Sequence, residues 1–362
     1  MMRVLLLGTT NSPHVEDIAI GLAQRGIKVV VGGSAAPSLP PSVLPAQGIR
    51  VVPAPTRAAA PPVRLARRVR WVRRLLRELR PDVVHAHVLS HDPFVAMLAG
   101  ARPLVATAWG SDVFLAARGP RLRARLVARR ADVLTADSRA LLDAIAELGA
   151  DRSRLRLFNW GVDLATFAPG RAEARGRLGL SDVPIVLAPR ALRPLYNPQT
   201  IVDAFDRLAD EFPGSLLLLK YYGDLPPALA ELRSRDDVRV VGRVPTEEVA
   251  DYYRAADVCV SIPSSDSSPR TVWEAMACGC PCVVSDLPWV HEWIQDGRDS
   301  LVTAIDADQV AAAVGRILRD KSLARSLATH GRSLVERHHD RRIQIDELVA
   351  VYAELARGNP VE

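Results

Sequence analysis

Lysine is nearly absent from this sequence of 362 residues. Of its 47 basic residues, Lys28, Lys220 and Lys321 are the lysines and the other 44 are arginines. Such a skew is typical of a GC-rich genome and does not by itself indicate an anionic ligand. The formal net charge of +6 therefore says less about partners than the positions of the arginines along the chain.

Cysteine is also scarce. Four cysteines do not make a disulfide framework in a chain this long. Cys278, Cys280 and Cys282 straddle a predicted helix end, a turn and a strand, and no second ligand pair or histidine cluster follows them. We therefore expect buried thiols rather than a metal centre.

Other absent features limit where in the cell the protein is expected and which class of protein it can be. No apolar run reaches the ~18–20 residues that cross a bilayer, and the apolar stretch within residues 1–8 is too short for a signal peptide. We expect a cytoplasmic protein. The absence of Gly-x-Gly-x-x-Gly after the first strand of either half argues against a dinucleotide-dependent dehydrogenase. Asp306 and Asp308 have the spacing of metal ligands. Because they lie where a helix is expected to begin, we expect an N-cap there rather than a metal site.

Strand and helix patterns alternate through most of the chain, and its length favours two domains. Predicted strands lie at 4–7, 28–31, 50–52, 82–87, 104–106, 132–136 and 155–158, then at 185–188, 216–219, 238–241, 258–262, 282–284 and 300–303. Predicted helices between the first set lie at 15–25, 63–80, 121–130 and 139–148. This repeated alternation predicts an α/β protein with parallel sheets covered on both faces.

The most informative segment is 257–284. An apolar run predicts a buried strand, a polar loop follows, and a helix is expected to end at Gly279 and Pro281. Asp266 lies in the loop and Glu274 in the helix. Ligands of open α/β sheets bind at such strand ends, where helix N–H groups can hold phosphate and carboxylates can accept hydrogen bonds from sugar hydroxyls.

This segment resembles the acid-x7-acid motif of retaining glycosyltransferases of family 4. Residues 159–170, Asn-Trp-Gly-Val-Asp-Leu-Ala-Thr-Phe-Ala-Pro-Gly, also resemble the segment that joins the two halves of those enzymes. The resemblance implies the GT-B fold, with two Rossmann-like parallel-sheet domains facing across a cleft. We expect an N-terminal acceptor domain (1–165), a C-terminal nucleotide-sugar domain (166–341) and a last helix (342–362) that crosses back to the first domain.

The resemblance also assigns the donor residues. Asp266 would contact the donor sugar, Glu274 the nucleotide ribose, and Arg190 the diphosphate. Further donor contacts are expected from Arg193, Gly242, Arg243, Val244, Ser267, Ser268, Arg270 and Thr271. The family has a Lys-Gly pair where this chain has Leu195-Tyr196-Asn197. Arg193, helix N-termini or Arg270 are the alternatives for the missing positive charge.

The first half is expected to hold the acceptor. His87 ends a predicted buried strand, and Asp112 lies in Ala-Trp-Gly-Ser-Asp (108–112), which resembles a His-Gly-Ser-Asp segment of the family. With Asp266 and Arg190, these two form the predicted catalytic set. Asn11, Trp109 and Gly110 are expected on the acceptor side. We expect His85 to be a core or supporting histidine instead.

In the family, transfer proceeds on one face of the sugar and the departing phosphate takes the acceptor proton. The resemblance therefore predicts a retaining, metal-independent hexosyltransferase without a cofactor. UDP- or GDP-sugars are the expected donors, and a polysaccharide, glycolipid or natural product hydroxyl is the expected acceptor. A nucleotide-sugar epimerase and a sugar-nucleotide-binding protein with weakened catalysis remain alternatives.

Two segments are unusually basic. Residues 64–80 hold eight arginines and one acid, with apolar residues at steps of three and four from Leu65 to Leu79, and residues 118–130 hold six arginines. One interpretation is a surface that binds anionic lipid on the inner face of the cell membrane, which suits a lipid-linked acceptor. The other is a sheet-covering helix with a solvated arginine face. We expect no nucleic-acid partner.

Overall fold

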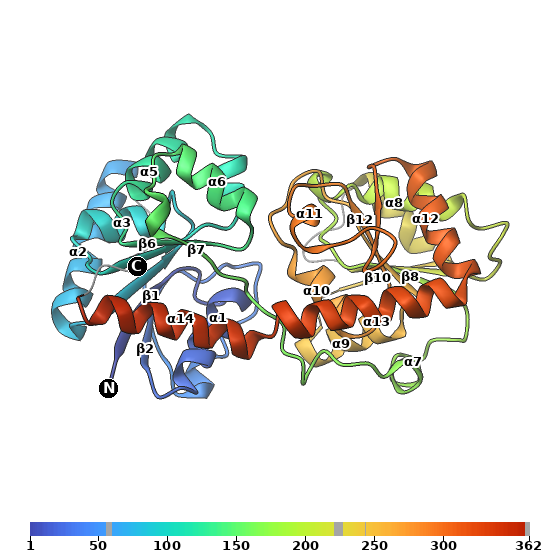
Figure 1. The fold of residues 1–362 in the computed structure, drawn as a ribbon, viewed down its shortest axis with the longest axis horizontal. Coiled ribbons are helices and arrows are strands. Elements are labelled where there is room, and N and C mark those ends of the chain that lie inside the picture. Colours follow the sequence, from blue (N-terminus) through green and yellow to red (C-terminus); the bar gives the residue numbers. More distant parts are fainter. Residues whose placement is uncertain (56–59, 221–226, 243, 359–362) are drawn as a thin grey trace. The chain divides into compact units, whose positions relative to one another are not determined.

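The computed structural model describes residues 1–55, 60–220, 227–242 and 244–358. Its chain divides into two compact units (Figure 1). Unit 1 comprises residues 1–160 and 342–362, and unit 2 comprises residues 161–341. The division therefore falls after Trp160, slightly before the expected boundary at residue 165.

Unit 1 is built on a parallel sheet of seven strands in the order β3-β2-β1-β4-β5-β6-β7. The strands are β1 (Arg3–Leu7), β2 (Lys28–Gly33), β3 (Arg50–Pro53), β4 (Val83–His87), β5 (Leu104–Thr107), β6 (Val133–Ala136) and β7 (Leu155–Leu157). The helices are α1 (Pro13–Ala23), α2 (Pro61–Leu79), α3 (Asp92–Ala99), α4 (Ser111–Phe114), α5 (Arg118–Ala128), α6 (Arg139–Glu147) and α14 (Arg341–Ala356).

Both faces of this sheet are covered, which explains the unbroken apolar runs in its central strands. Leu5 and Leu7 point into a core shared with α2, α3, α5 and α6. Val4 and Leu6 point to the opposite face, where α1 and α14 pack. Figure 1 shows α14 and α1 side by side on that face. A helix from the end of the chain thus completes the first unit.

Unit 2 repeats the plan with six parallel strands in the order β10-β9-β8-β11-β12-β13. The strands are β8 (Ile185–Ala188), β9 (Leu216–Lys220), β10 (Val238–Val241), β11 (Val258–Ser261), β12 (Cys282–Ser285) and β13 (Leu301–Thr303). The helices are α7 (Arg171–Leu178), α8 (Pro198–Asp206), α9 (Thr246–Ala255), α10 (Arg270–Ala277), α11 (Val290–Trp293), α12 (Ala307–Arg319) and α13 (Lys321–His338). The predicted α/β class with two Rossmann-like sheets is confirmed.

Two helices differ from their predicted form. Helix α5 begins at Arg118 rather than Arg121, because Pro120 is tolerated in the first turn of a helix. In α2 the buried stripe is made by Val69, Trp71, Val72 and Leu75, whereas Leu65, Leu76 and Leu79 are only partly buried. The helix is therefore rotated from the orientation that the spacing predicted.

Several smaller expectations are confirmed. All four cysteines are free and buried. Asp306 caps α12, since its carboxylate accepts a hydrogen bond of 3.0 Å from the backbone N–H of Gln309. Within the described residues, no helix combines the length and apolar character needed to span a membrane.

Candidate functional site

The order of the strands marks one edge of unit 2. The chain runs outward through β8, β9 and β10, then returns to the other side of β8 and continues through β11, β12 and β13. The loops that follow β8 and β11 therefore separate at the carboxyl edge of the sheet, where open α/β sheets bind ligands. The first loop carries Arg190 and the second carries Asp266.

Arg190 and Asp266 form an ion pair at this point, with 2.7 Å between Nη2 and Oδ2. The Arg190 guanidinium also lies 3.3 Å from Thr271 Oγ1 and 4.3 Å from the centre of the Tyr196 ring. Each charged side chain is 16% exposed, so both are held by neighbours while still reachable by a ligand. Tyr196 supports Arg190 through a cation–π contact.

Glu274 is fixed more deeply, on α10. Its Oε1 accepts a hydrogen bond of 2.6 Å from Arg270, and its Oε2 accepts one of 3.1 Å from the hydroxyl of Tyr253 on α9. The side chain of Trp273 anchors the helix by donating to Ser268 Oγ at 2.9 Å and stacking on His339. Two hydrogen bonds therefore hold the carboxylate of Glu274 in one orientation.

The other predicted donor residues lie on several loops of unit 2. Ser267 and Ser268 are buried, and the backbone N–H of Ser267 donates to Asp266 Oδ1 at 2.9 Å. Gly242 follows β10 and is exposed, and Val244 is partly buried beside α9. Arg193 is exposed in the loop after β8. The prediction for Arg243 lies outside the described residues.

Lys220 is a residue at this edge that the sequence reasoning missed. It ends β9 and is 1% exposed. Burial lowers the pKa of its ammonium group to about 8, although the negative charges of Glu274 and Glu248 act to raise it. The sequence does contain a signal for this position, because one of its three lysines directly follows four leucines of a buried strand. Its placement puts a positive charge near the carboxylate of Glu274.

Unit 1 has an equivalent edge, where β1 and β4 are neighbours and the strand order reverses. Asp112 ties two loops together there. Its Oδ2 accepts a hydrogen bond of 2.6 Å from the backbone N–H of Leu89, and its Oδ1 accepts one of 2.9 Å from that of Trp109. Burial raises the pKa of the Asp112 carboxyl, and these N–H groups oppose the rise. Both oxygens are therefore engaged in holding backbone.

His87 and Trp109 belong to an imidazole–indole cluster with His14 and Trp160. The ring centres of Trp109 lie 5.2 Å from His14, 5.6 Å from Trp160 and 6.1 Å from His87. His87 is fully buried, and burial lowers its pKa to about 4, so its ring is neutral at pH 7. His14 and Trp109 are only half-buried and form the accessible part of the cluster. Sequence reasoning missed His14 and Trp160.

Three further residues complete this edge. The ring nitrogens of His85 lie 2.5 Å from Tyr352 Oη and 2.5 Å from Thr107 Oγ1, which confirms the expected core role. The Asn11 side chain donates to the carbonyls of Ala36, Leu39 and Pro40 and accepts from the N–H of Ala36. It therefore secures the loop after β2. Gly110 has φ +90°, a conformation that favours glycine, where the chain enters α4.

Comparison with known proteins decides the family. The model of "Glycosyltransferase Family 4" matches residues 12–166, and that of "Glycosyl transferases group 1" matches residues 184–320. The D-inositol 3-phosphate glycosyltransferase of Acidothermus cellulolyticus is 32% identical, over 84% of this chain and 77% of that protein. This chain belongs to glycosyltransferase family 4.

Other relatives of this family 4 glycosyltransferase differ in their named substrates. A GDP-mannose-dependent alpha-(1-6)-phosphatidylinositol monomannoside mannosyltransferase of Mycolicibacterium smegmatis is 29% identical, over 77% of this chain and 79% of that protein. The crystal structure of Anabaena HepE in complex with UDP-glucose matches with a TM-score of 0.81 and 19% identity, covering 98% of this chain and all of that chain. That likeness shows the shared fold.

The two family models divide the candidate residues of the glycosyltransferase between them. The match at residues 184–320 contains Arg190, Lys220, Asp266 and Glu274. The match at residues 12–166 contains the imidazole–indole cluster and Asp112. Each set lies at the carboxyl edge of its own sheet.

Proposed function

We propose that the enzyme transfers a sugar from a nucleotide diphosphate sugar to an acceptor hydroxyl with retention of configuration. The Arg190–Asp266 pair at the strand-order reversal of unit 2 is the observation that carries this proposal. It joins a cation suited to a diphosphate with a carboxylate suited to sugar hydroxyls. The named ligand of the HepE structure and the named donor of the mannosyltransferase favour UDP- or GDP-sugars.

Different residues of unit 2 then bind different parts of the donor. Arg190 faces the diphosphate, with the first backbone N–H groups of α10 and the side chains of Ser268, Arg270 and Thr271 beside it. Asp266 accepts hydrogen bonds from the transferred sugar, and Glu274 accepts them from the ribose. Because Arg270 and Tyr253 fix the carboxylate of Glu274 in advance, less freedom is lost when the nucleotide binds.

The reaction requires one bond to form and one to break on the same face of the sugar. The acceptor oxygen attacks the anomeric carbon while the bond from that carbon to the diphosphate oxygen breaks. The hydroxyl proton passes to the departing phosphate oxygen. Arg190 stabilises the charge that develops there, and no carboxylate nucleophile of the protein is needed.

We also propose that transfer needs no metal ion, because positive side chains can serve the diphosphate. Arg190 and the exposed Arg193 lie in the loop after β8, and Lys220 ends the neighbouring strand. Lys220 is the candidate that replaces the missing family lysine. Transfer at full rate in excess EDTA is the expected outcome, and an EDTA-sensitive rate restored by Mg²⁺ would contradict this part.

The acceptor is proposed to bind at the carboxyl edge of unit 1. His14 and Trp109 offer an aromatic surface of the kind that packs against the apolar face of a sugar ring. His87 and Asp112 support this surface, since the His87 ring meets the Trp109 ring edge-on and Asp112 holds the Trp109 backbone. The relatives act on D-inositol 3-phosphate and on a phosphatidylinositol mannoside by name. A hydroxyl of a phosphorylated polyol or of a glycolipid is therefore the proposed acceptor.

A cytoplasmic enzyme that associates with the inner membrane surface would suit a glycolipid acceptor. Helix α2 supports this proposal through charge, because Arg67, Arg70, Arg73, Arg74 and Arg77 are exposed on it. Arg68 is not part of that surface, since it is buried and paired with Asp92 at 2.5 Å. The α2 surface attracts anionic lipid and contributes little apolar area.

Two substitutions test the proposed reaction. Asp266→Asn and Glu274→Gln keep size and remove one charge each. Asp266→Asn should lower kcat by at least about 100-fold, and Glu274→Gln should raise the donor KM by about 10- to 100-fold. The matched control Asp308→Asn, at an exposed side chain of α12, should change neither.

The assay is release of free nucleotide in the presence of a panel of UDP- and GDP-sugars, with the product anomer read by NMR. Release that depends on an added acceptor and gives the donor's anomeric configuration supports the proposal. Release without any acceptor would favour the epimerase, and an inverted product would refute retention.

A further inference from the structure

Helices α4 and α5 expose an unusual amount of apolar surface. Phe114, Leu115, Leu122 and Leu126 are 38%, 55%, 59% and 36% exposed, and we call them the α4–α5 face. Ten large hydrophobic side chains are exposed in the described part of the chain, and these four lie within 13 consecutive positions. Single exposed leucines are ordinary on a protein surface, but a local group of this kind marks an interaction site.

The packing of α5 shows that unit 1 does not need these side chains. Ala124, Val127 and Ala128 are fully buried and form the inward side of the helix. Leu122 and Leu126 are four residues apart and share the opposite side. Small residues inside and leucines outside reverse the usual order for a helix that only covers a sheet.

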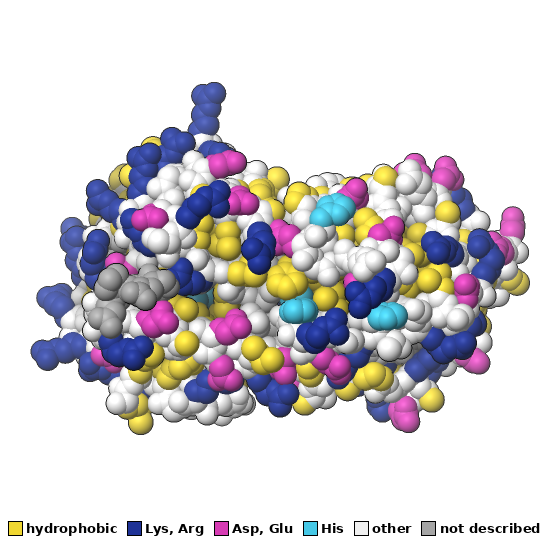
Figure 2. All heavy atoms as spheres, viewed as in Figure 1, with side chains coloured by type: hydrophobic (Ala, Val, Ile, Leu, Met, Phe, Trp, Pro, Cys, Tyr) yellow, Lys and Arg dark blue, Asp and Glu magenta, His cyan; other side chains and the backbone are white. Residues whose placement is uncertain are grey.

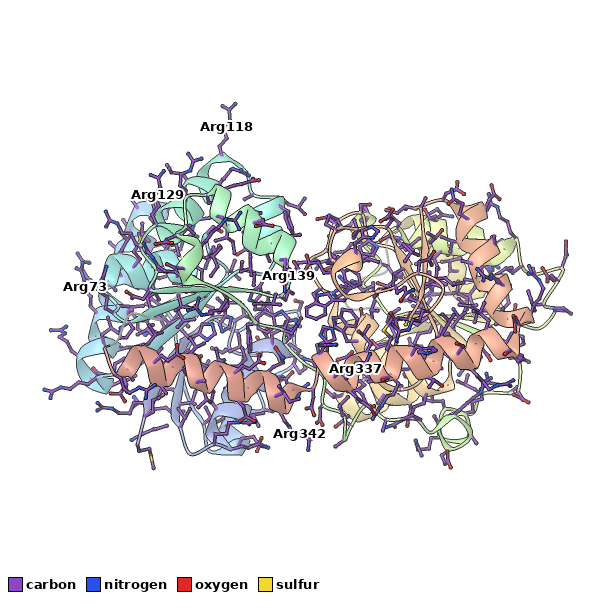
Figure 3. The ribbon with its side chains drawn as sticks, viewed as in Figure 1. Arg73, Arg118, Arg129, Arg139, Arg337 and Arg342 are labelled. Carbon is purple, nitrogen blue, oxygen red and sulfur yellow. The ribbon has the colours of Figure 1, made fainter. Side chains whose placement is uncertain are left out.

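Arginines surround the exposed leucines. Arg118, Arg121, Arg123, Arg125, Arg129 and Arg130 are all exposed, and none forms an ion pair with a residue that the structure describes. Asp112, the acidic residue within residues 111–130, is buried and accepts a hydrogen bond from the backbone N–H of Leu89. Figure 2 shows arginine and lysine side chains gathered on unit 1. In Figure 3, Arg118 projects outward at the start of α5 and Arg129 lies near its end.

We propose that the α4–α5 face docks on an anionic lipid bilayer, with Phe114 and the three leucines in the interfacial layer and the arginines at the lipid phosphates. Helices that lie on membranes combine large apolar side chains with flanking arginines in this way. A second copy of the same face is a poor partner, because arginines would meet arginines. A nucleic acid is also a poor fit, because the exposed side chains are mainly aliphatic and offer little for bases to stack on.

This inference rests on the membrane association proposed above and assigns the inserting element. Helix α2 directs Val69, Trp71, Val72 and Leu75 into the core, so its outer surface is mainly charged, and Val63 is its exposed large apolar side chain. Helix α4 also begins directly after Gly110, with Asp112 turned inward and Phe114 turned outward. A bilayer that held Phe114 would therefore lie close to the acceptor-side residues 109–112, which suits a glycolipid acceptor.

Vesicle sedimentation at physiological salt tests the proposal. The probes are vesicles of phosphatidylcholine with and without phosphatidylglycerol. The wild-type protein should bind the anionic vesicles more tightly than the neutral ones, and Leu115→Ser with Leu122→Ser should weaken that binding at least about tenfold. The control Ile343→Ser removes an apolar side chain of α14 that is 45% exposed and should leave binding unchanged.

Two outcomes would overturn the proposal. One is no binding of the wild-type protein, and the other is full binding of the Leu115→Ser, Leu122→Ser variant. If Arg73→Ser with Arg77→Ser alone abolishes binding and the leucine variant does not, α2 is the membrane surface and the α4–α5 face is not. Transfer to a water-soluble acceptor without vesicles should be the same for all variants, which separates this proposal from that of the reaction.

Insertion can be measured directly. Because all four native cysteines are buried, Leu122→Cys gives one accessible thiol for an environment-sensitive dye. The dye emission should shift to the blue when anionic vesicles are added. Binding without such a shift would show contact through charge only and would overturn the insertion of the α4–α5 face.

Discussion

Lys220 places a buried positive charge near a carboxylate that we assign to the nucleotide. Its ammonium is 1% exposed, and burial lowers its pKa from 10.5 to about 8. A drop of that size corresponds to about 3 kcal/mol of unfavourable folding free energy. The residue is retained at a cost in stability, which is common where a side chain serves binding.

Lys220→Met should therefore raise the thermal stability of unit 2 and weaken donor binding. Below pH 8 Lys220 is charged in both the folded and the unfolded state, so the substitution gives its full gain in stability there. Between pH 8 and 10.5 the folded state loses its proton first, so the gain in stability shrinks.

Thermal unfolding at pH 7 and pH 10, with donor titrations at pH 7, measures the effects of Lys220→Met on stability and on donor binding. Lys321→Met, at an exposed lysine of α13, is the control. An unchanged donor affinity would contradict the proposed role.

At the residue scale, the sequence predicted the residues that belong to a local motif. The positions of Arg190 and Asp266 after strand ends, and of Glu274 in the next helix, followed from apolar runs and helix stops. The partners of Asn11 did not follow, because its amide binds backbone carbonyls beyond the next strand, at residues 36–40. Tyr253 was missed for the same reason, since it reaches Glu274 from another helix. Long-range contacts of single side chains leave no local pattern.

Helix α14 belongs to the core of unit 1 although it ends the chain. Ile345, Leu348 and Tyr352 are buried against α1 and the sheet. Arg25 pairs with Asp346 and also donates to the carbonyl of Arg342, so polar contacts flank this packing. The helix thus closes one face of a sheet whose strands come from the first half of the sequence.

Leu348→Ala should destabilise unit 1 by about 2–4 kcal/mol, because the side chain is buried and leaves a cavity. Ile343→Ala, on the exposed side of the same helix, should change stability by no more than about 0.5 kcal/mol. Hydrogen exchange measured by peptide assigns the loss to a unit. Faster exchange confined to residues 161–341 would contradict the placement of this helix.

The elements themselves were largely predictable, since buried parallel strands read as apolar runs and their helices as amphipathic segments. Less predictable was which side of a helix faces the sheet. In α2, arginines at most outward positions left several equivalent apolar stripes, and tertiary packing chose the one with Trp71 and Leu75. In α5 the small residues face inward, which a search for large apolar residues cannot find.

Both units bury neutral histidines, so the whole molecule should lose stability in acid. Burial lowers the pKa of His87 to about 4 and that of His339 to about 3, and it holds the pKa of His85 well below 6.5. An unfolded chain binds protons at these sites near pH 6.5, whereas the folded protein does so only at lower pH. Stability therefore falls as the pH drops from about 6.5 towards 4.

Chemical unfolding at pH 7, 6, 5 and 4 measures this slope. His339→Phe keeps the stack on Trp273 and removes one buried imidazole of unit 2, so it should flatten the slope of that unit alone. His91→Phe, at a half-exposed histidine in the loop before α3, is the control substitution. Equal stability of the wild-type protein at pH 7 and pH 5 would refute the prediction.

The return of the chain to its first sheet also bears on synthesis. The strands of unit 1 leave the ribosome before unit 2, yet residues 342–356, which cover one face of those strands, leave only after unit 2. Unit 2, whose residues 161–341 are continuous, can be finished earlier. The half that emerges first is therefore completed after the half that follows it, and until residues 342–356 emerge its uncovered leucines and valines are clients for chaperones.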